Sequence, residues 1–230
     1  MKNKNDVCVI VQARLSSQRC PQKMVRPFAD DTLTGIILKK LVASSVIPRE
    51  NIFLSVHEPE LVSIGQENGI NIFHRSHESA IWDGGEGTHL TGMYEWWDKL
   101  PYTYAILING CAPMMTTDTI DDFYSRYLNS PSDGMFAVIE KKNYFWNTDG
   151  KLIVPWPEGE PCMNTKAVTT TLEAAHCLYA GRMDRIGDGI WMGDFNNGEI
   201  DLVPMPEEET FDVDYEWEFS LYEKLYKASL

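Results

Sequence analysis

The segment VCVIVQARLSSQRCPQK, residues 7–23, begins with five apolar residues and then becomes polar and basic. Four of those five are β-branched, a pattern typical of a buried β-strand. The polar part carries Arg14, Arg19 and Lys23, and no acidic residue occurs between positions 6 and 30, although the formal net charge is -14. A buried strand that ends in an isolated cationic loop indicates a polyphosphate site beside the sheet of an α/β protein.

The composition is ordinary for a globular protein, with 43% hydrophobic and 23% charged residues among 230. A chain of this length buries roughly 70% of its unfolded surface and needs no disulfide or structural metal to fold. We therefore expect a single α/β domain over residues 1–230. The acidic net charge argues against nucleic acid and anionic membranes as partners, because their phosphates would be repelled.

The cysteines point to a reducing compartment. There are five, scattered along the chain without a C-x-x-C pair, so a disulfide framework or a zinc site is not expected. The polar start is followed by an apolar run too short for a signal peptide. No segment approaches the roughly 18 apolar residues of a membrane span. We expect a cytoplasmic protein.

Strand and helix patterns alternate in the first half of the chain, which predicts a mainly parallel sheet with helices on both faces. The predicted strands cover residues 7–11, 52–56, 70–73 and 104–108. The predicted helices cover residues 32–45, 59–68, 90–97 and a segment capped by Thr117 or Asp118 that runs to Leu128.

The pattern changes after about residue 139. Residues 143–153 predict a hairpin with an Asp149-Gly150 turn, and three prolines make residues 154–165 irregular. We treat residues 140–166 as an insertion in the domain. Its aromatic side chains require a partner surface, and two alternatives remain open: the core of the same chain or a second subunit.

The basic loop resembles neither a Walker A motif nor a dinucleotide fingerprint, because it contains no glycine. Phosphates would instead be held by the guanidinium and ammonium groups, the Ser16 and Ser17 hydroxyls and the loop amides. The alternative is that these cations simply decorate an exposed loop.

A second charged motif is FDVDYE, residues 211–216. In an extended segment Asp212 and Asp214 point to the same side, and paired carboxylates are ligands suited to Mg²⁺. The alternative is a solvated acidic surface, since many glutamates lie nearby. A polyphosphate site and a Mg²⁺ site together are what nucleotidyl transfer requires.

The pattern Ala13-Arg14-x-x-Ser17-x-x-x-Pro21-x-Lys23 resembles the signature loop of the cytidylyltransferases that make CMP-activated sugar acids. This family includes CMP-sialic acid and CMP-Kdo synthetases and related spore-coat polysaccharide enzymes. Residues 108–113 are similar to its second nucleotide-binding loop, residues 211–214 to its metal-binding Asp-x-Asp, and residues 74–76 to a segment that often carries an arginine near the nucleotide.

The resemblance implies a three-layer α/β/α nucleotide-diphosphosugar-transferase (Rossmann-like) fold and Mg²⁺-dependent transfer of CMP from CTP to an anionic sugar acid, with release of pyrophosphate. It implies Arg14, Lys23 and Asp214 as catalytic residues, Asp212 and Asp214 as Mg²⁺ ligands, and a homodimer that uses the insertion. The implied nucleotide-binding residues are Ala13, Arg14, Ser16, Ser17, Arg19, Lys23, Arg75, Asn109, Gly110, Cys111 and Ala112.

The chain departs from the family pattern at several positions. Met24 stands where sialate synthetases have Asn, and Cys111 where Kdo and spore-coat enzymes often have Asp. Residues 174–179 match no acceptor motif, and we name His176 and Lys166 as acceptor contacts. Two alternatives follow: a phosphonate or other unusual acid as acceptor, or a nucleotide-binding subunit without activity.

Overall fold

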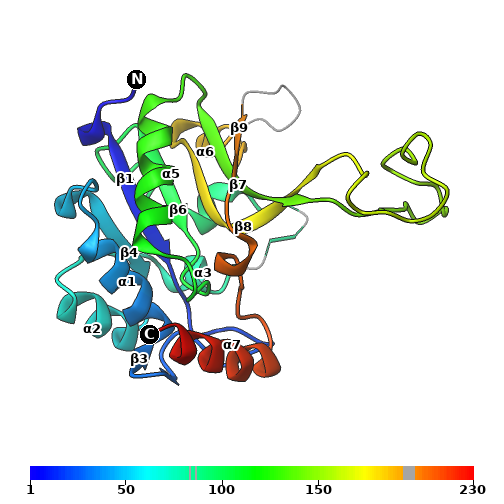
Figure 1. Ribbon diagram of the computed structural model, residues 1–230. Helices are drawn as coiled ribbons and strands as arrows, with labels where there is room; N and C mark the ends of the chain where they lie inside the picture. Colours follow the sequence, from blue (N-terminus) through cyan, green and yellow to red (C-terminus); the bar gives the residue numbers. More distant parts are fainter. Residues whose placement is uncertain (83, 86, 194–199) are drawn as a thin grey trace.

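A seven-stranded sheet forms the centre of the computed structural model, which describes residues 1–82, 84–85, 87–193 and 200–230 (Figure 1). The strand order is β5-β4-β1-β6-β8-β7-β9, and in this sheet all strands are mutually parallel except β8. The strands are β1 Val7–Gln12, β4 Ile52–Val56, β5 Asn71–His74, β6 Tyr104–Ile108, β7 Gly134–Lys141, β8 Thr171–Arg182 and β9 Ile200–Pro204, with a separate two-stranded ribbon of β2 Pro27–Phe28 and β3 Asp31–Thr32.

The predicted mainly parallel sheet is confirmed. The four predicted strands correspond to β1, β4, β5 and β6, with ends that agree to within one residue. The first five residues of β1 are completely buried, because β1 lies in the sheet between β4 and β6 and is covered on both faces. This burial explains why its sequence is a continuous apolar run rather than an alternating one.

Helices cover both faces of the sheet and complete three layers. On one face, Val9 shares a buried cluster with Leu61 and Phe123 of two helices. On the other face, Ile10 shares a second cluster with Trp96. The helices are α1 Leu33–Ala43, α2 Pro59–Glu67, α3 His77–Ala80, α4 Leu90–Met93, α5 Thr117–Asn129, α6 Asp184–Gly187 and α7 Glu216–Ser229, with 3-10 turns η1 Lys4–Asp6, η2 Arg49–Asn51 and η3 Glu207–Glu209. Across the described ranges, every helix is too short or too polar to cross a membrane.

Two helix predictions need correction. Thr116 caps α5, not Thr117 or Asp118: its Oγ1 accepts a hydrogen bond from the amide of Thr119 at 3.2 Å. The helix expected over residues 90–97 ends at Met93. The chain then turns so that Trp96 is fully buried and donates from its Nε1 to Gln12 at 3.0 Å. Tertiary packing outweighs the helical spacing here.

The C-terminal half contains elements that the sequence did not predict, namely β7, β8, β9, α6 and α7. Strand β8 begins with Thr-Leu-Glu-Ala-Ala, a composition that does not favour strands. It is held by β6 on one side and β7 on the other. Its pairing with β7 shifts register between Phe136 and Val138, and residues of β8 around His176 bulge out there.

The segment between β7 and β8, residues 142–170, projects from the sheet as an arm (Figure 1). The predicted hairpin is present: Trp146 pairs with Leu152, and Gly150 adopts a φ of 77° in the turn. Tyr144 is buried in a small cluster of the arm itself, whereas Trp146 remains 50% exposed. The arm therefore covers only part of its own apolar surface.

Helix α1 holds the loop that follows β6 through Lys40. Its Nζ donates hydrogen bonds to the carbonyl oxygens of Pro113 and, at 2.6 Å, of Met115. Burial lowers the pKa of Lys40 to about 8, opposed by the charge of Glu209. The folded protein therefore binds this proton more weakly than the unfolded chain does.

We expect Lys40→Met to change how stability depends on pH. Between pH 8 and the unfolded lysine pKa near about 10.4, the unfolded chain holds more protons, so this group makes stability rise with pH. Urea unfolding at pH 7.5 and 9.5 should show the wild type gaining stability relative to Lys40→Met. Lys39→Met is the control, because Asp31 raises the pKa of Lys39 and its contribution should stay constant over this range. An equal pH dependence for all three proteins would contradict the expectation.

Candidate active site

A cavity of about 670 Å³ lies at the carboxyl ends of β1 and β6. This is where parallel α/β sheets usually bind ligands. We call it the first cavity. The predicted site residues that line it are Ala13, Arg14, Ser16, Ser17, Arg19, Lys23, Asn109, Cys111, Asp212 and Asp214.

The basic loop and the paired aspartates meet directly in this cavity. Arg19 Nη2 lies 2.8 Å from Asp214 Oδ1, and Lys23 Nζ lies 3.3 Å from the same oxygen. Lys23 also donates a hydrogen bond to the carbonyl oxygen of Val213. Residues separated by about 190 positions in sequence thus form one charged cluster.

Lys23 is the buried cation of the cluster, with an exposed fraction of only 9%. Burial acts to lower its pKa, but the hydrogen bond to the Cys111 side chain and the charges of Asp212 and Asp214 raise the pKa above the ordinary lysine value. The side chain is therefore charged at neutral pH. A nearly buried ammonium beside carboxylates is preorganised to hold a phosphate group.

Asp212 is the less solvated of the two aspartates. Its Oδ1 is buried and, within the described part of the chain, has no hydrogen-bond partner. Burial raises its pKa, Lys23 opposes this shift and Asp214 adds to it. A buried carboxylate oxygen without a donor, beside a second carboxylate, fits Mg²⁺ by the chemistry of its oxygen ligands.

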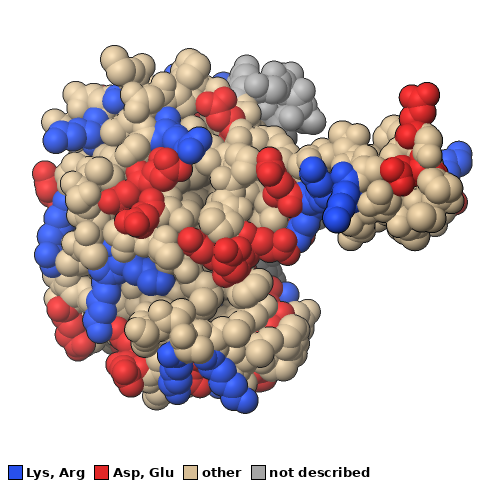
Figure 2. All heavy atoms as spheres, viewed as in Figure 1, with Lys and Arg blue, Asp and Glu red and all other residues tan. Residues whose placement is uncertain are grey.

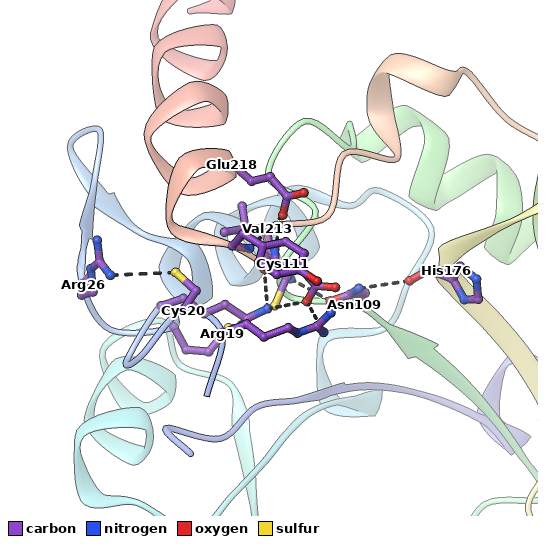
Figure 3. Close-up of polar contacts among 12 residues, drawn as sticks. Arg19, Cys20, Arg26, Asn109, Cys111, His176, Val213 and Glu218 are labelled. Carbon is purple, nitrogen blue, oxygen red and sulfur yellow. Dashed lines mark hydrogen bonds and ion pairs between the residues drawn. The ribbon is translucent and has the colours of Figure 1, made fainter. Parts of the chain in front are cut away.

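Only some residues of the loop after β6 line the cavity. Asn109 lines the cavity and connects two strands, since its Nδ2 donates to the carbonyl oxygen of His176 at 3.0 Å and its Oδ1 accepts from Cys111 at 2.9 Å (Figure 3). Gly110 and Ala112 are buried behind the cavity. A Cβ on Gly110 would lie 2.9 Å from the end of the Met24 side chain, which would have to shift to make room for it.

The two departures from the family pattern are in contact with each other. Cys111 Sγ lies 3.4 Å from Met24 Sδ. Burial raises the pKa of the Cys111 thiol to about 12, so the thiol is neutral at physiological pH. Positions 24 and 111 are therefore joined by a contact between two sulfur atoms.

The remaining predicted residues are placed differently. Arg75 lies outside the first cavity and lines an adjacent second cavity. His176 is on the rim of that cavity, in the bulge of β8, with a φ of 54°. Arg14 lines both cavities and donates to the carbonyl oxygen of Trp82 at 2.8 Å. Lys166 lies on the arm, exposed and away from both.

The sequence did not indicate several residues that line the second cavity. Gln12, Trp82, Tyr94, Tyr179 and Trp191 all line the second cavity. Gln12 directly follows the strand run, and that position was the one signal available. The aromatic residues come from four separate segments, so no local pattern could have grouped them.

Some of the acidic side chains gather near the base of the arm. Figure 2 shows acidic side chains concentrated around η3, beside basic side chains at the base of the arm. There Lys141 pairs with Glu207 and, at 3.5 Å, with Glu173. Exposed pairs of this kind add little stability.

Comparison with known proteins places the chain in context. A family model described as Cytidylyltransferase matches residues 8–175. Curated protein sequences give no match. Among solved structures, CMP:2-keto-3-deoxy-manno-octonic acid synthetase complexed with CTP has a TM-score of 0.69 and 13% identity, covering 98% of this chain and 100% of that one.

Two further structures are similar. A cytidylyltransferase from Leptospira borgpetersenii serovar Hardjo-bovis has a TM-score of 0.63 and 15% identity, covering 98% of this chain and 88% of that one. 4-Diphosphocytidyl-2C-methyl-D-erythritol synthase from Anaerococcus prevotii has a TM-score of 0.65 and 11% identity, covering 98% and 100%. At these identities the likeness establishes the fold, which is that of nucleotidyltransferases.

We expect Asp212→Asn to stabilise the ligand-free protein. The folded-state pKa of Asp212 is raised, so its ionised form costs stability above that pKa. At pH 7 the amide should add on the order of 1 kcal/mol to the free energy of unfolding. The gain should shrink as the pH falls toward the ordinary aspartate pKa of about 3.9.

Urea unfolding measures this difference, with Asp214→Asn as the matched control. Asp214→Asn removes the pairing with Arg19 and Lys23 and should not stabilise the protein. Equal destabilisation by the two substitutions would show that the ionised Asp212 side chain does not destabilise the folded protein.

Proposed function

Since the chain belongs to the cytidylyltransferase family and is therefore a CTP-using nucleotidyltransferase, we propose that it transfers CMP to an anionic acceptor acid with the help of Mg²⁺. The observation that carries this proposal is the contact of Arg19 and Lys23 with Asp214 in a single cavity. A triphosphate in that cavity would meet cations on one side and metal-binding carboxylates on the other.

The reaction is a displacement at the α-phosphorus of CTP. An acceptor oxygen forms a bond to this phosphorus while the bond to the oxygen that bridges to the β-phosphorus breaks, and pyrophosphate leaves with that electron pair. A hydroxyl acceptor also loses its proton to solvent or to a carboxylate. Arg14 and Lys23 line the cavity and stabilise the negative charge that develops on the phosphates.

Asp212 and Asp214 would hold Mg²⁺. When bound, the ion neutralises phosphate charge and polarises the phosphorus–oxygen bonds. In the free protein Asp214 is paired with Arg19 and Lys23. Triphosphate binding would draw these cations toward the phosphates and free the carboxylate.

The proposal also includes the contacts to the acceptor and the formation of a homodimer. His176 is positioned by its bulge at the edge of the site, where its Nδ1 lies 3.1 Å from the Tyr179 hydroxyl. Lys166 lies on the arm and does not line the cavities of its own chain, so it would contact an acceptor bound by another subunit. The exposed Trp146 and Ile153 of the arm support a homodimer, in which the arm of one subunit packs on its partner.

Lys23→Ala and Asp214→Asn should each reduce turnover by about 10²–10³-fold, the usual effect of removing one preorganised charge. Pyrophosphate release from CTP with acceptor measures this loss. Arg26→Ala is the matched control, because Arg26 lies in the same loop but pairs with Glu216 outside the cavity. Near-normal release in either site variant would contradict the proposed roles.

A thermal-shift comparison of the four nucleoside triphosphates tests the nucleotide. CTP with Mg²⁺ at about 100 times its Kd should contribute about 2.7 kcal/mol, a rise of roughly 5–10 °C for a chain of this size. The Mg²⁺-dependent part should vanish when Asp212 and Asp214 are both replaced by Asn. Equal shifts for all four nucleotides would argue against a cytidylyltransferase site. CTP binding without pyrophosphate release for any acid would indicate the inactive subunit instead.

A further inference from the structure

The backbone on both sides of Arg14 is held by charged side chains. The carbonyl oxygen of Ala13 accepts a hydrogen bond from Nη2 of Arg75 at 2.6 Å. The amide of Leu15 donates to Oε1 of Glu58 at 2.8 Å. These two groups belong to the peptide units that flank the Cα of Arg14. Because each peptide unit is planar, fixing both of them restricts the backbone dihedral angles of Arg14.

Glu58 is itself fixed by the fold. It follows β4, which ends at Val56 and pairs with β1, so it lies at the edge of the sheet where the basic loop begins. Its carbonyl oxygen accepts from the amides of Leu61 and Val62, both at 3.1 Å, at the start of α2. Pro59 follows it and favours the extended backbone that it adopts. Its side chain does not cap α2 and reaches the basic loop instead.

Glu58 also balances the charges of two arginines. Arg75 is buried, with an exposed fraction of 4%. Burial lowers its pKa to about 10, the charge of Glu58 opposes this shift, and the charge of Arg14 adds to it. The two guanidinium groups thus repel each other, and Glu58 offsets the repulsion. The second carboxylate oxygen of Glu58 is buried without a hydrogen-bond partner among the described residues, which reduces what Glu58 contributes to stability.

The side chain of Arg14 depends on this backbone for its direction. Its guanidinium lines the first cavity and donates from Nη1 to the carbonyl oxygen of Trp82 at 2.8 Å. Arg19 pairs with Asp214, whereas Arg14 forms no ion pair within the described part of the chain. An arginine without a counter-charge can bind an incoming phosphate strongly. A displacement of about 1 Å at such a group can cost about 10²-fold in rate.

We propose that Glu58 is a positioning residue of the nucleotide site: its carboxylate fixes the backbone beside Arg14 and so directs the Arg14 guanidinium toward the triphosphate. Glu58 itself does not contact the nucleotide. This inference rests on the proposed function, because it requires that Arg14 binds the phosphates of CTP.

A double-mutant cycle tests this role. Calorimetry measures how the protein with Mg²⁺ binds the α,β-methylene analogue of CTP, which cannot react. The four proteins are the wild type, Glu58→Leu, Arg14→Met and the double variant. We expect each single substitution to weaken binding about tenfold or more, since each removes or misplaces a charge-assisted hydrogen bond. With methionine at position 14, Glu58→Leu should weaken binding less than about twofold, because no guanidinium is left to position.

Two further variants identify the interaction. Glu58→Gln keeps an oxygen that can accept from the Leu15 amide, and it should bind the analogue more tightly than Glu58→Leu does. Glu60→Leu is the matched control, because Glu60 is exposed in the first turn of α2, and it should bind like the wild type. If Glu58→Leu does not fold, as judged by circular dichroism, Glu58→Gln replaces it in the cycle. Its loss should then be about threefold in the wild type, since its hydrogen bond is neutral, and absent in Arg14→Met.

The outcomes keep this inference distinct from the proposed function. Failure of the wild type to bind the CTP analogue would overturn the proposed function, and the inference with it. If the wild type binds the analogue but Glu58→Leu binds it equally well, the inference alone is wrong. An equal loss from Glu58→Leu with arginine and with methionine at position 14 would also overturn it, because Glu58 would then support the fold in general. So would unchanged binding in Arg14→Met.

Discussion

The fixed position of Val213 is the constraint on which the site depends. Its amide donates to the carbonyl oxygen of Cys111 at 3.0 Å, its own carbonyl oxygen accepts from Lys23, and its side chain is completely buried. The loops after β1 and β6 and the C-terminal segment are thereby joined at one residue. Because these bonds are mostly buried, a shift of any of the three segments would leave a polar group unpaired. The facing charges are a consequence of this junction.

The parallel half of the fold was predictable because each of its strands and helices has a recognisable pattern within its own segment of the sequence. Buried strands such as β1 and β4 are continuous apolar runs, and the helices between them carry their own periodicity. Strand β8 is different, since it is stabilised by its neighbours β6 and β7 and its sequence gives no strand signal. The early end of α4 has the same origin, because Trp96 is buried in a cluster with residues distant in sequence, such as Ile10, and bonds to Gln12.

In the candidate site, too, some residues could be identified from local sequence and others only from the folded structure. Alternation alone placed Asp212 and Asp214 on one side, and the basic composition marked the loop that contains Lys23. The aromatic cavity could not be foreseen, because its walls converge only after the sheet has formed. The distinction between Arg75 and the other arginines also needs coordinates, since burial and the partners of each guanidinium nitrogen are not local properties.

The sulfur contact between Met24 and Cys111 couples these two positions. An asparagine at position 24 would place an amide against the thiol of Cys111, and an aspartate at position 111 would place a carboxylate against the thioether of Met24. The effect of either substitution on stability therefore depends on the residue at the other position, so the effect of the double substitution is not the sum of the two single effects.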